Sequence, residues 1–222
     1  MLRVVSLVPS ATETLRAWGI EPVACTRFCE QSDLQHVGGT KDPDLAAITD
    51  LAPDLVVVDE EENRREDHDA LVFAGISVHV LAVRDLAHLD EQMNGLAGAV
   101  GATWDPIGSI TEPDATRRAF VPIWRRPWMA LGEPTYGSAV LRALGIVNVA
   151  AADGAYPMVD PREAASRDVD LVIAPSEPYP FTERHRAELE AIAPVVFVDG
   201  RDLLWWGVRT NGALTRLAGV LG

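Results

Sequence analysis

An internal repeat constrains the fold of this chain more than any other feature of its sequence. Residues 15–20, Leu-Arg-Ala-Trp-Gly-Ile, recur at 141–146 with a single change, at an offset of 126 positions. An Asp-Pro dipeptide followed by an Asp-Leu-Val run also recurs, as 42–43 with 54–56 and as 160–161 with 170–172. Because the order is the same in both halves, the repeat predicts two similar lobes in tandem.

Each half alternates short runs of β-branched residues with helical segments. In the first half we expect strands at 3–8, 55–58 and 77–81 and helices at 10–19, 44–52 and 63–74. In the second half we expect strands at 120–124, 171–174 and 195–198 and helices at 138–144, 161–167 and 182–192. Such alternation is typical of parallel sheets covered on both faces. The predicted fold class is therefore α/β, with two lobes of parallel sheet and a ligand cleft between them.

Two motifs predict where helices begin. Ser10 and Glu13 have the spacing of a capping box, and Gly19 would end the helix that they open. Asp42 and Pro43 would supply the N-cap and the first-turn proline of the next helix.

The repeat also predicts the domain limits. We expect an N-terminal lobe over 1–100, a connector over 101–118 and a C-terminal lobe over 119–222. Residues 86–100 are typical of an amphipathic helix, whereas the connector contains Pro106 and Pro113. Pro113 should break or kink any helix there. Even as a helix, residues 105–118 would span at most about 21 Å.

Charge and cysteine content exclude several functions. The chain has 19 basic and 33 acidic residues and a net charge of −14, which disfavours binding to nucleic acid or to an anionic membrane surface. The two cysteines, Cys25 and Cys29, provide no disulfide framework and no four-ligand zinc site. The apolar run at 4–8 is too short for a signal segment or a membrane span. We therefore expect a cytoplasmic protein as the sequence stands, and an extracytoplasmic one if an export signal has been removed.

Ligands of open parallel sheets bind beyond the carboxyl ends of the strands. In the first half, these segments hold an aromatic ring, a thiol and a carboxylate at Phe28, Cys29 and Glu30. They also hold four successive acids at 59–62, which begin with Asp59 and Glu60. Acids at the start of a helix favour its dipole, but four in a row also repel one another. That excess favours contact with a cation, a metal complex or arginines of a partner.

Aromatic residues dominate the corresponding segments of the second half. Most of them lie in loops beside Pro or Gly, where core packing explains them poorly. They suit the wall of a site for a large flat or cyclic ligand. The candidates are Trp128, Tyr136, Tyr156, Tyr179, Trp205 and Trp206, with Arg209 beside the last two.

The residues by themselves leave other functions open. Cys29 would act as the nucleophile of a cleft enzyme, or Cys29 and Glu30 would bind a metal ion, although no sequence feature selects a histidine partner. A cytoplasmic sensor or accessory protein that docks through its acidic loop is a third hypothesis. The sequence lacks the G-x-S-x-G and H-E-x-x-H motifs.

Several motifs together resemble the helical-backbone metal receptor family. They are residues 3–13, the Val-Gly-Gly turn at 37–39, the Ala-Pro-Asp-Leu-Val run at 52–56, and Trp-Gly-Val-Arg at 206–209. The family comprises periplasmic-type substrate-binding proteins of ABC importers for cobalamin, haem and ferric siderophores. The resemblance implies two Rossmann-like lobes joined by one long helix, with the ligand held between them.

The resemblance also implies site residues and partners. The family's cleft positions fall at Phe28, Cys29, Glu30, Thr40, Asp59, Glu60, Trp128, Tyr156, Tyr179 and the segment from Trp205 to Arg209. Thr40 and Asp59 differ from the aromatic clamp of the cobalamin binders, and the interlobe helix is shortened. Glu62 and Glu177 are the candidates for docking on an ABC-importer permease. The predicted function is a monomeric, non-enzymatic binder of a small metal-chelate ligand that requires no cofactor.

Overall fold

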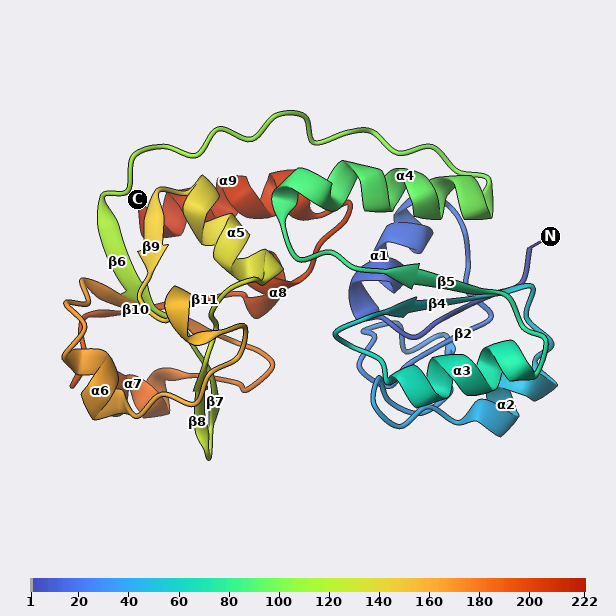
Figure 1. Cartoon of the computed structure of the whole chain (residues 1–222), viewed down its shortest axis with the longest axis horizontal. Helices are drawn as coiled ribbons and strands as arrows, with labels where there is room; N and C mark the ends of the chain where they lie inside the picture. Colours follow the sequence, from blue (N-terminus) through green and yellow to red (C-terminus); the bar gives the residue numbers. More distant parts are fainter. Residues whose placement is uncertain (1) are drawn as a thin grey trace. The chain divides into compact units, whose positions relative to one another are not determined.

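The computed structural model describes residues 2–222, which form two compact units (Figure 1). Unit 1 contains the chain up to Val83 together with Leu89–Pro106 and Trp206–Val208. Unit 2 contains Arg84–His88, Ile107–Trp205 and Arg209–Gly222. Each unit has its own parallel sheet, which confirms the predicted α/β class with two lobes.

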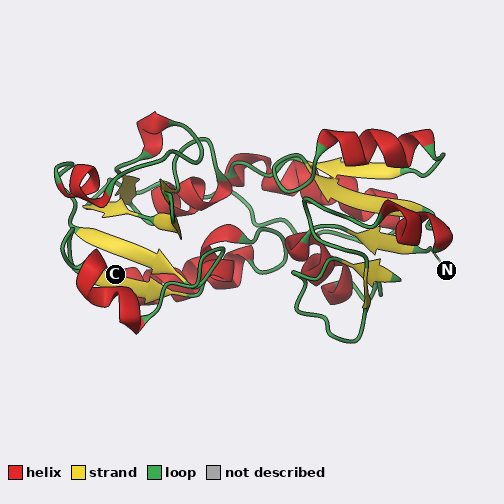
Figure 2. Ribbon diagram, turned by 90° about the horizontal axis from the view of Figure 1, so that it is seen from below, coloured by secondary structure: helices red, strands yellow, loops and turns green. Residues whose placement is uncertain are grey.

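Unit 1 is built on a five-stranded sheet in the order β3-β2-β1-β4-β5, and all its strands are parallel. Figure 2 shows these strands side by side. The strands are β1 (Val4–Ser6), β2 (Ala24–Cys25), β3 (Gln35–His36), β4 (Leu55–Asp59) and β5 (Val78–Leu81). The helices are α1 (Pro9–Ala17), α2 (Leu45–Asp50), α3 (Arg65–Phe73) and α4 (Leu89–Val100).

The core of unit 1 follows from the alternation of side chains along its strands. Val5, Val56 and Val58 lie on one face with Ile48 of α2 and Leu71 of α3. Helices α2 and α3 cover this face, and α4 lies on the opposite side of the sheet (Figure 1). The central strands are buried on both faces, which explains why their sequences are continuously apolar.

Unit 2 has a four-stranded parallel sheet in the order β11-β10-β6-β9 and a separate antiparallel hairpin, β7-β8. The strands are β6 (Arg117–Phe120), β7 (Pro122–Arg125), β8 (Trp128–Ala130), β9 (Ile146–Asn148), β10 (Leu171–Pro175) and β11 (Val195–Val198). The α-helices are α5 (Tyr136–Ala143), α6 (Pro161–Ala165), α7 (Arg186–Leu189), α8 (Gly200–Leu204) and α9 (Thr210–Leu221). Single 3-10 turns are η1 (Leu86–His88), η2 (Ala151–Asp153) and η3 (Glu183–His185). No helix within 2–222 is both long and apolar enough to cross a membrane.

The internal repeat has a structural counterpart in both units. The segments 15–20 and 141–146 lie at the ends of α1 and α5, and each contains a glycine in the left-handed conformation, with φ of 75° at Gly19 and 67° at Gly145. A second shared element is a carboxylate at the start of β4 and of β10. Asp54 Oδ2 accepts the backbone N–H of Arg3 at 2.8 Å, and Asp170 Oδ2 accepts that of Arg118 at 2.7 Å. The Asp-Leu-Val motif therefore recurs because its aspartate anchors the neighbouring strand.

Two helix starts differ from their predictions. No side chain caps α1, which begins at Pro9, so Ser10 lies inside the helix and does not form a capping box. The N-cap of α2 is Asp44, whose side chain accepts the N–H of Ala47 at 3.0 Å. Asp42 instead forms an ion pair with Arg27, and its carboxylate lies 2.9 Å from the guanidinium.

Two strand and connector predictions also differ. The parallel strand expected at 120–124 is β6, three residues earlier, and the chain then turns into the β7-β8 hairpin. Residues 102–116 contain neither helix nor strand. The backbone N–H of Thr116 is bonded to the carbonyl of Gly145 at 2.9 Å, which leads the chain into β6.

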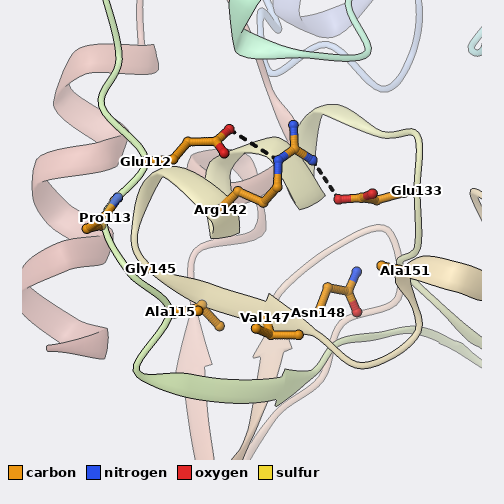
Figure 3. A pocket seen from close by; sticks show the side chains of 10 residues that line it. Glu112, Pro113, Ala115, Glu133, Arg142, Gly145, Val147, Asn148 and Ala151 are labelled. Carbon is orange, nitrogen blue, oxygen red and sulfur yellow. Dashed lines mark hydrogen bonds and ion pairs between the residues drawn. The ribbon is translucent and has the colours of Figure 1, made fainter.

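A cavity of about 240 Å³ lies in unit 2 beside β9, α5 and residues 112–115 (Figure 3). Arg142 of α5 is one of the residues that line it, and its guanidinium bonds to Glu112 at 3.2 Å and to Glu133 at 2.6 Å. The same guanidinium bonds to Asp85 at 2.5 Å. None of the predicted ligand-binding residues lines this cavity, and we interpret Arg142 as the anchor that holds the irregular segment against α5.

Candidate functional site

The loops that follow the parallel strands of unit 1 lie together at one edge of its sheet. They comprise residues 7–10 after β1, 26–30 after β2, 37–41 after β3 and 59–63 after β4. The edge therefore brings together Phe28, Cys29, Glu30, Thr40, Asp59, Glu60 and Glu62, as the sequence predicts for the carboxyl ends of parallel strands.

Asn63 joins three of these loops, and sequence analysis did not identify it. Its Nδ2 donates to the carbonyl of Thr40 at 2.9 Å and to that of Leu7 at 3.3 Å. Its Oδ1 accepts the N–H of Asp59 at 2.9 Å. The residue is buried, so these bonds are shielded from water. The only signal in the sequence was an asparagine four residues after an aspartate at a strand end.

Asp59 is buried at the end of β4, and its Oδ1 accepts the N–H groups of Glu61 at 2.9 Å and Glu62 at 3.3 Å. Burial raises the pKa of Asp59 to about 6, and the nearby charges of Glu62 and Glu61 add to the rise, although the two N–H bonds oppose it. Lys41 donates to the backbone carbonyl of Glu61 and so adds a positive charge to the same loop.

The raised pKa of Asp59 predicts a specific pH dependence of stability. The folded pKa lies about two units above the unfolded value of about 3.9, so folding disfavours the charged form and stability falls as pH rises through about 6. We expect Asp59→Asn to remove this loss. Between pH 4 and pH 8 the free energy of unfolding of wild type should therefore fall by about 2 kcal/mol relative to that of the variant. Urea unfolding at both pH values measures the difference. Asp50→Asn, at an exposed position, is the control, and an equal change in both variants would contradict the prediction.

Phe28 presents its ring at the same edge, because its side chain is 53% exposed. The guanidinium of Arg27 lies 4.9 Å from the ring centroid and also pairs with Asp42, which restricts the ring from one side. Glu30 and Glu60 are exposed nearby, whereas Thr40 is buried.

Cys29 is buried. Its sulfur lies 3.2 Å from Thr12 Oγ1 and 3.4 Å from Thr26 Oγ1. None of these partners is a general base, so the geometry does not form the nucleophile and base pair that a Cys-dependent enzyme needs. Within 2–222 no group of three or more His, Cys, Asp or Glu residues is arranged to hold a metal ion.

In unit 2 the corresponding loops carry a cluster of aromatic rings. Tyr179 lies 5.8 Å from Trp124 in an edge contact and 4.8 Å from Phe181, between ring centroids. Trp128 of β8 stacks on Phe181 at 6.0 Å. His185, whose Nε2 lies 3.3 Å from the Tyr179 hydroxyl, completes the cluster. The hairpin therefore places Trp124 and Trp128 against the loop that follows β10.

Three large apolar side chains of this region are exposed. Trp124 is 43% exposed, Tyr156 is 42% exposed and Met158 is 74% exposed. A backbone bridge joins Met129 of β8 to Met158, which places the loop after β9 beside the hairpin. Met158 did not figure in the sequence analysis, because one methionine in a loop carries no pattern.

Three of the predicted aromatic residues are buried, and the predicted Arg209 is largely buried. Tyr136, Trp205 and Trp206 are buried. The Tyr136 hydroxyl bonds to Thr210 Oγ1 at 3.0 Å, and burial raises the pKa of this hydroxyl. Arg209 lies over the Trp205 ring at 5.5 Å from its centroid. The structure therefore places these side chains in packing contacts, and their role as ligand contacts stays a prediction.

The two glutamates predicted to dock on a partner follow β4 and β10. Glu62 is exposed, and Glu177 is partly exposed. Gly200 packs closely on Glu177, since a Cβ at Gly200 would stand 2.7 Å from the Glu177 nitrogen and 2.9 Å from its carbonyl oxygen. Only glycine fits this approach without movement of the backbone.

The fold is shared with solved binding proteins. No family model and no curated protein matches the sequence. The periplasmic vitamin B12-binding protein BtuF of Vibrio cholerae matches with a TM-score of 0.78 at 20% identity, over 99% of this chain and 96% of its own. The periplasmic heme-binding protein BhuT in complex with two hemes matches with a TM-score of 0.80 at 20% identity, over 99% and 97%. The periplasmic heme-binding protein RhuT from Roseiflexus sp. RS-1 matches with a TM-score of 0.77 at 19% identity, over 99% and 97%. At these identities the likeness defines the fold, which is the one that the sequence motifs predicted.

Proposed function

We propose that this protein binds a metal-chelate ligand, namely a corrinoid such as cobalamin, a haem or a ferric siderophore, for delivery to an ABC importer. One observation carries the proposal. Large apolar side chains stand exposed on the strand-end loops of both units, in a fold that solved vitamin B12-binding and heme-binding proteins share. The predicted cleft that would hold the ligand stays part of this proposal.

The energetics favour a ligand with large flat surfaces. Phe28 and Tyr156 each expose about half of their surface, at loop positions where polar residues are the rule. Covering about 80 Å² of one ring would stabilise a complex by about 2 kcal/mol at 25 cal/mol per Å². Two or three such rings account for a substantial part of the roughly −8 kcal/mol that corresponds to micromolar affinity. Glu30 and Glu60 would supply acceptor oxygens to polar groups of the ligand.

The remaining parts of the proposal concern partners and location. The solved proteins that share the fold are periplasmic binding proteins, which supports a binding protein that works outside the cytoplasmic membrane. We further propose that it acts as a monomer and catalyses no reaction. Glu62 and Glu177 would then contact the permease, because each extends from a strand-end loop of a different unit.

The test is a tryptophan-fluorescence titration of the full chain with cobalamin, haem and a ferric siderophore in parallel. We expect saturable quenching by one of the three with a dissociation constant of about 1 μM or tighter. Failure of all three to bind at ten times that concentration would overturn the proposal.

Phe28→Ala is expected to weaken binding of the ligand identified in this way by about tenfold, because the variant removes roughly 1.4 kcal/mol of apolar contact. Phe73→Ala is the matched control, since Phe73 is 95% exposed at the end of α3, at the opposite edge of the same sheet. The titration measures both. Equal affinity of the two variants would remove Phe28 from the proposed contact set.

A further inference from the structure

The two cysteines of the chain lie together in unit 1, and the proposed binding function does not use them. Cys25 is the last residue of β2, and Cys29 follows in the next turn, where its N–H bonds to the carbonyl of Thr26 at 3.1 Å. Both thiols are free. Cys25 pairs with Ser6 across β1 and β2, and Thr12 Oγ1 bonds both to Ser6 Oγ at 2.8 Å and to Cys29 Sγ at 3.2 Å, so the two cysteines lie on the same, α1-facing side of the sheet. A four-residue spacing on one face of the sheet positions the two thiols to approach each other, as an intramolecular disulfide requires.

The surroundings of Cys29 stabilise a thiolate. Thr26 Oγ1 accepts the N–H of Phe28 at 3.3 Å, so its single proton is available to the Cys29 sulfur at 3.4 Å. Thr12 Oγ1 lies 3.2 Å from the same sulfur on the side of α1, and its proton is shared with Ser6 Oγ at 2.8 Å and with the carbonyl of Val8 at 3.0 Å. The neighbouring Cys25 thiol, followed by the hydroxyls of Thr12 and Thr26, lowers the pKa of Cys29 against the effect of burial. The proximity of Cys29, together with burial, raises the pKa of Cys25, which remains a protonated thiol.

The two thiols differ in solvent exposure, and this difference sets the order in which they are oxidised. Cys29 is 5% exposed, and Cys25 is completely buried. A small oxidant therefore reacts with Cys29 first. Cys25 then reacts with the oxidised Cys29 sulfur and not with the oxidant itself.

We propose that Cys29 and Cys25 form an oxidisable pair in which a hydroperoxide oxidises Cys29 and Cys25 then closes an intramolecular disulfide. The Cys29 thiolate attacks the terminal oxygen of the hydroperoxide, the O–O bond breaks, and the leaving alkoxide or hydroxide takes a proton to become an alcohol or water. The Cys25 sulfur then attacks the Cys29 sulfenic acid, the S–O bond breaks, and the hydroxyl leaves as water with the proton of the Cys25 thiol. Overall, two thiols lose two electrons and two protons, and one hydroperoxide is reduced to one alcohol and one water, or to two waters when it is hydrogen peroxide.

The two threonines distinguish this pair from two thiols that are merely close. They bond to the reduced Cys29 sulfur, and a disulfide sulfur is a much weaker acceptor than a thiolate. Reduction and oxidation would therefore change the contacts of the loop that carries Phe28. This second consequence rests on the proposed function, whereas the thiol chemistry does not.

The experiment treats the reduced full-length chain with equimolar hydrogen peroxide at pH 7 and follows its intact mass and free thiols. We expect the monomer to lose two hydrogen masses and both thiols together. In Cys25→Ser we expect no disulfide and a sulfenic acid at Cys29 that dimedone traps, and in Cys29→Ser the remaining thiol should react at least tenfold more slowly. Retention of both thiols in wild type, or equal reactivity of the two single variants, would overturn the proposal.

A second pair of variants tests the role of the hydroxyls. Thr26→Val keeps the shape of the side chain but removes the donor, and we expect oxidation of Cys29 to slow at least threefold while circular dichroism shows a folded chain. Thr49→Val is the matched control, since its hydroxyl bonds to a carbonyl of its own helix, 2.8 Å away, at an exposed position. Equal rates in both variants would show that Thr26 does not activate the thiol and would contradict the proposed pair. Retained ligand affinity after oxidation would contradict only the link to binding.

Discussion

Replacement of Asn63 with alanine is expected to lower the free energy of unfolding by about 3 kcal/mol and to weaken ligand binding by at least tenfold. The variant leaves the carbonyls of Leu7 and Thr40 and the N–H of Asp59 without this partner in a buried position. Each buried polar group that loses its hydrogen bond costs about 1–3 kcal/mol. The loops after β1, β3 and β4 would also lose their common tie, which is why binding should weaken along with stability.

The control for Asn63 is another asparagine that donates to a backbone carbonyl. Asn94 is exposed on α4, and its Nδ2 bonds to the carbonyl of Asp90 at 2.7 Å. Because water replaces an exposed hydrogen bond, Asn94→Ala should change stability by no more than about 0.5 kcal/mol. Urea unfolding measures both variants, and similar effects at the two positions would show that Asn63 does not organise the loops.

Asp202→Asn is expected to destabilise the protein by about 2–4 kcal/mol at pH 7. Asp202 Oδ1 bonds to the Arg209 guanidinium at 2.6 Å, and its two oxygens bond to Arg216 at 2.7 Å. Asp202 and Arg209 are both largely buried, and loss of one partner leaves the other charge uncompensated. Arg216 is the more exposed of the two arginines, so solvent screens part of its interaction with Asp202.

The pH dependence of this variant has a definite sign. Hydrogen bonds from Arg216, and then from Arg209, hold the pKa of Asp202 below its usual value. The stability that they contribute is therefore present above the unfolded pKa of about 3.9 and is lost as pH falls through the lower folded value. Thermal unfolding of wild type and Asp202→Asn should differ at pH 7 and converge at about pH 2.

Glu183→Gln provides the comparison for Asp202→Asn, since it neutralises an acid that pairs with Arg186 at an exposed site. We expect a change of no more than about 0.5 kcal/mol, which is typical of surface ion pairs. A large loss of stability in Glu183→Gln together with a small loss in Asp202→Asn would contradict the prediction that the buried ion pair contributes more than the surface pair.

Most helices and strands could be predicted because their signals are local. The continuous apolar runs at 55–58 and 171–174 indicated buried parallel strands, and they are β4 and β10. The hairpin β7-β8 was not predicted. It follows the parallel strand β6 directly, without the helix that the alternating pattern leads one to expect, and its two strands pair only with each other. Strand β9 and helix α8 also escaped prediction, since such short sequences become regular only when they pack on the sheet. Helix α9 was missed although its buried residues follow a helical spacing.

The candidate site was predictable only in outline. The rule that ligands bind beyond strand ends located the loops that hold Phe28, Asp59 and Tyr179, because the edge of a parallel sheet follows from chain direction. Which side chains point outward could not be deduced, since a loop has no fixed period. Tyr136 and Trp206 are buried, whereas Met158 is exposed.

The sequence by itself determined that this protein has two similar α/β lobes, because repeated motifs and apolar runs record the backbone pattern of each half. It also determined the chemistry available at the strand ends, namely acids and one aromatic ring in the first unit and several aromatic rings in the second. Only the tertiary structure decided that Asn63 ties three loops, that Cys25 and Cys29 lie on the same face of the sheet, and that Asp202 bonds to two arginines. These contacts depend on the direction of each side chain and on which distant segments folding brings together. Local sequence patterns specify neither of these.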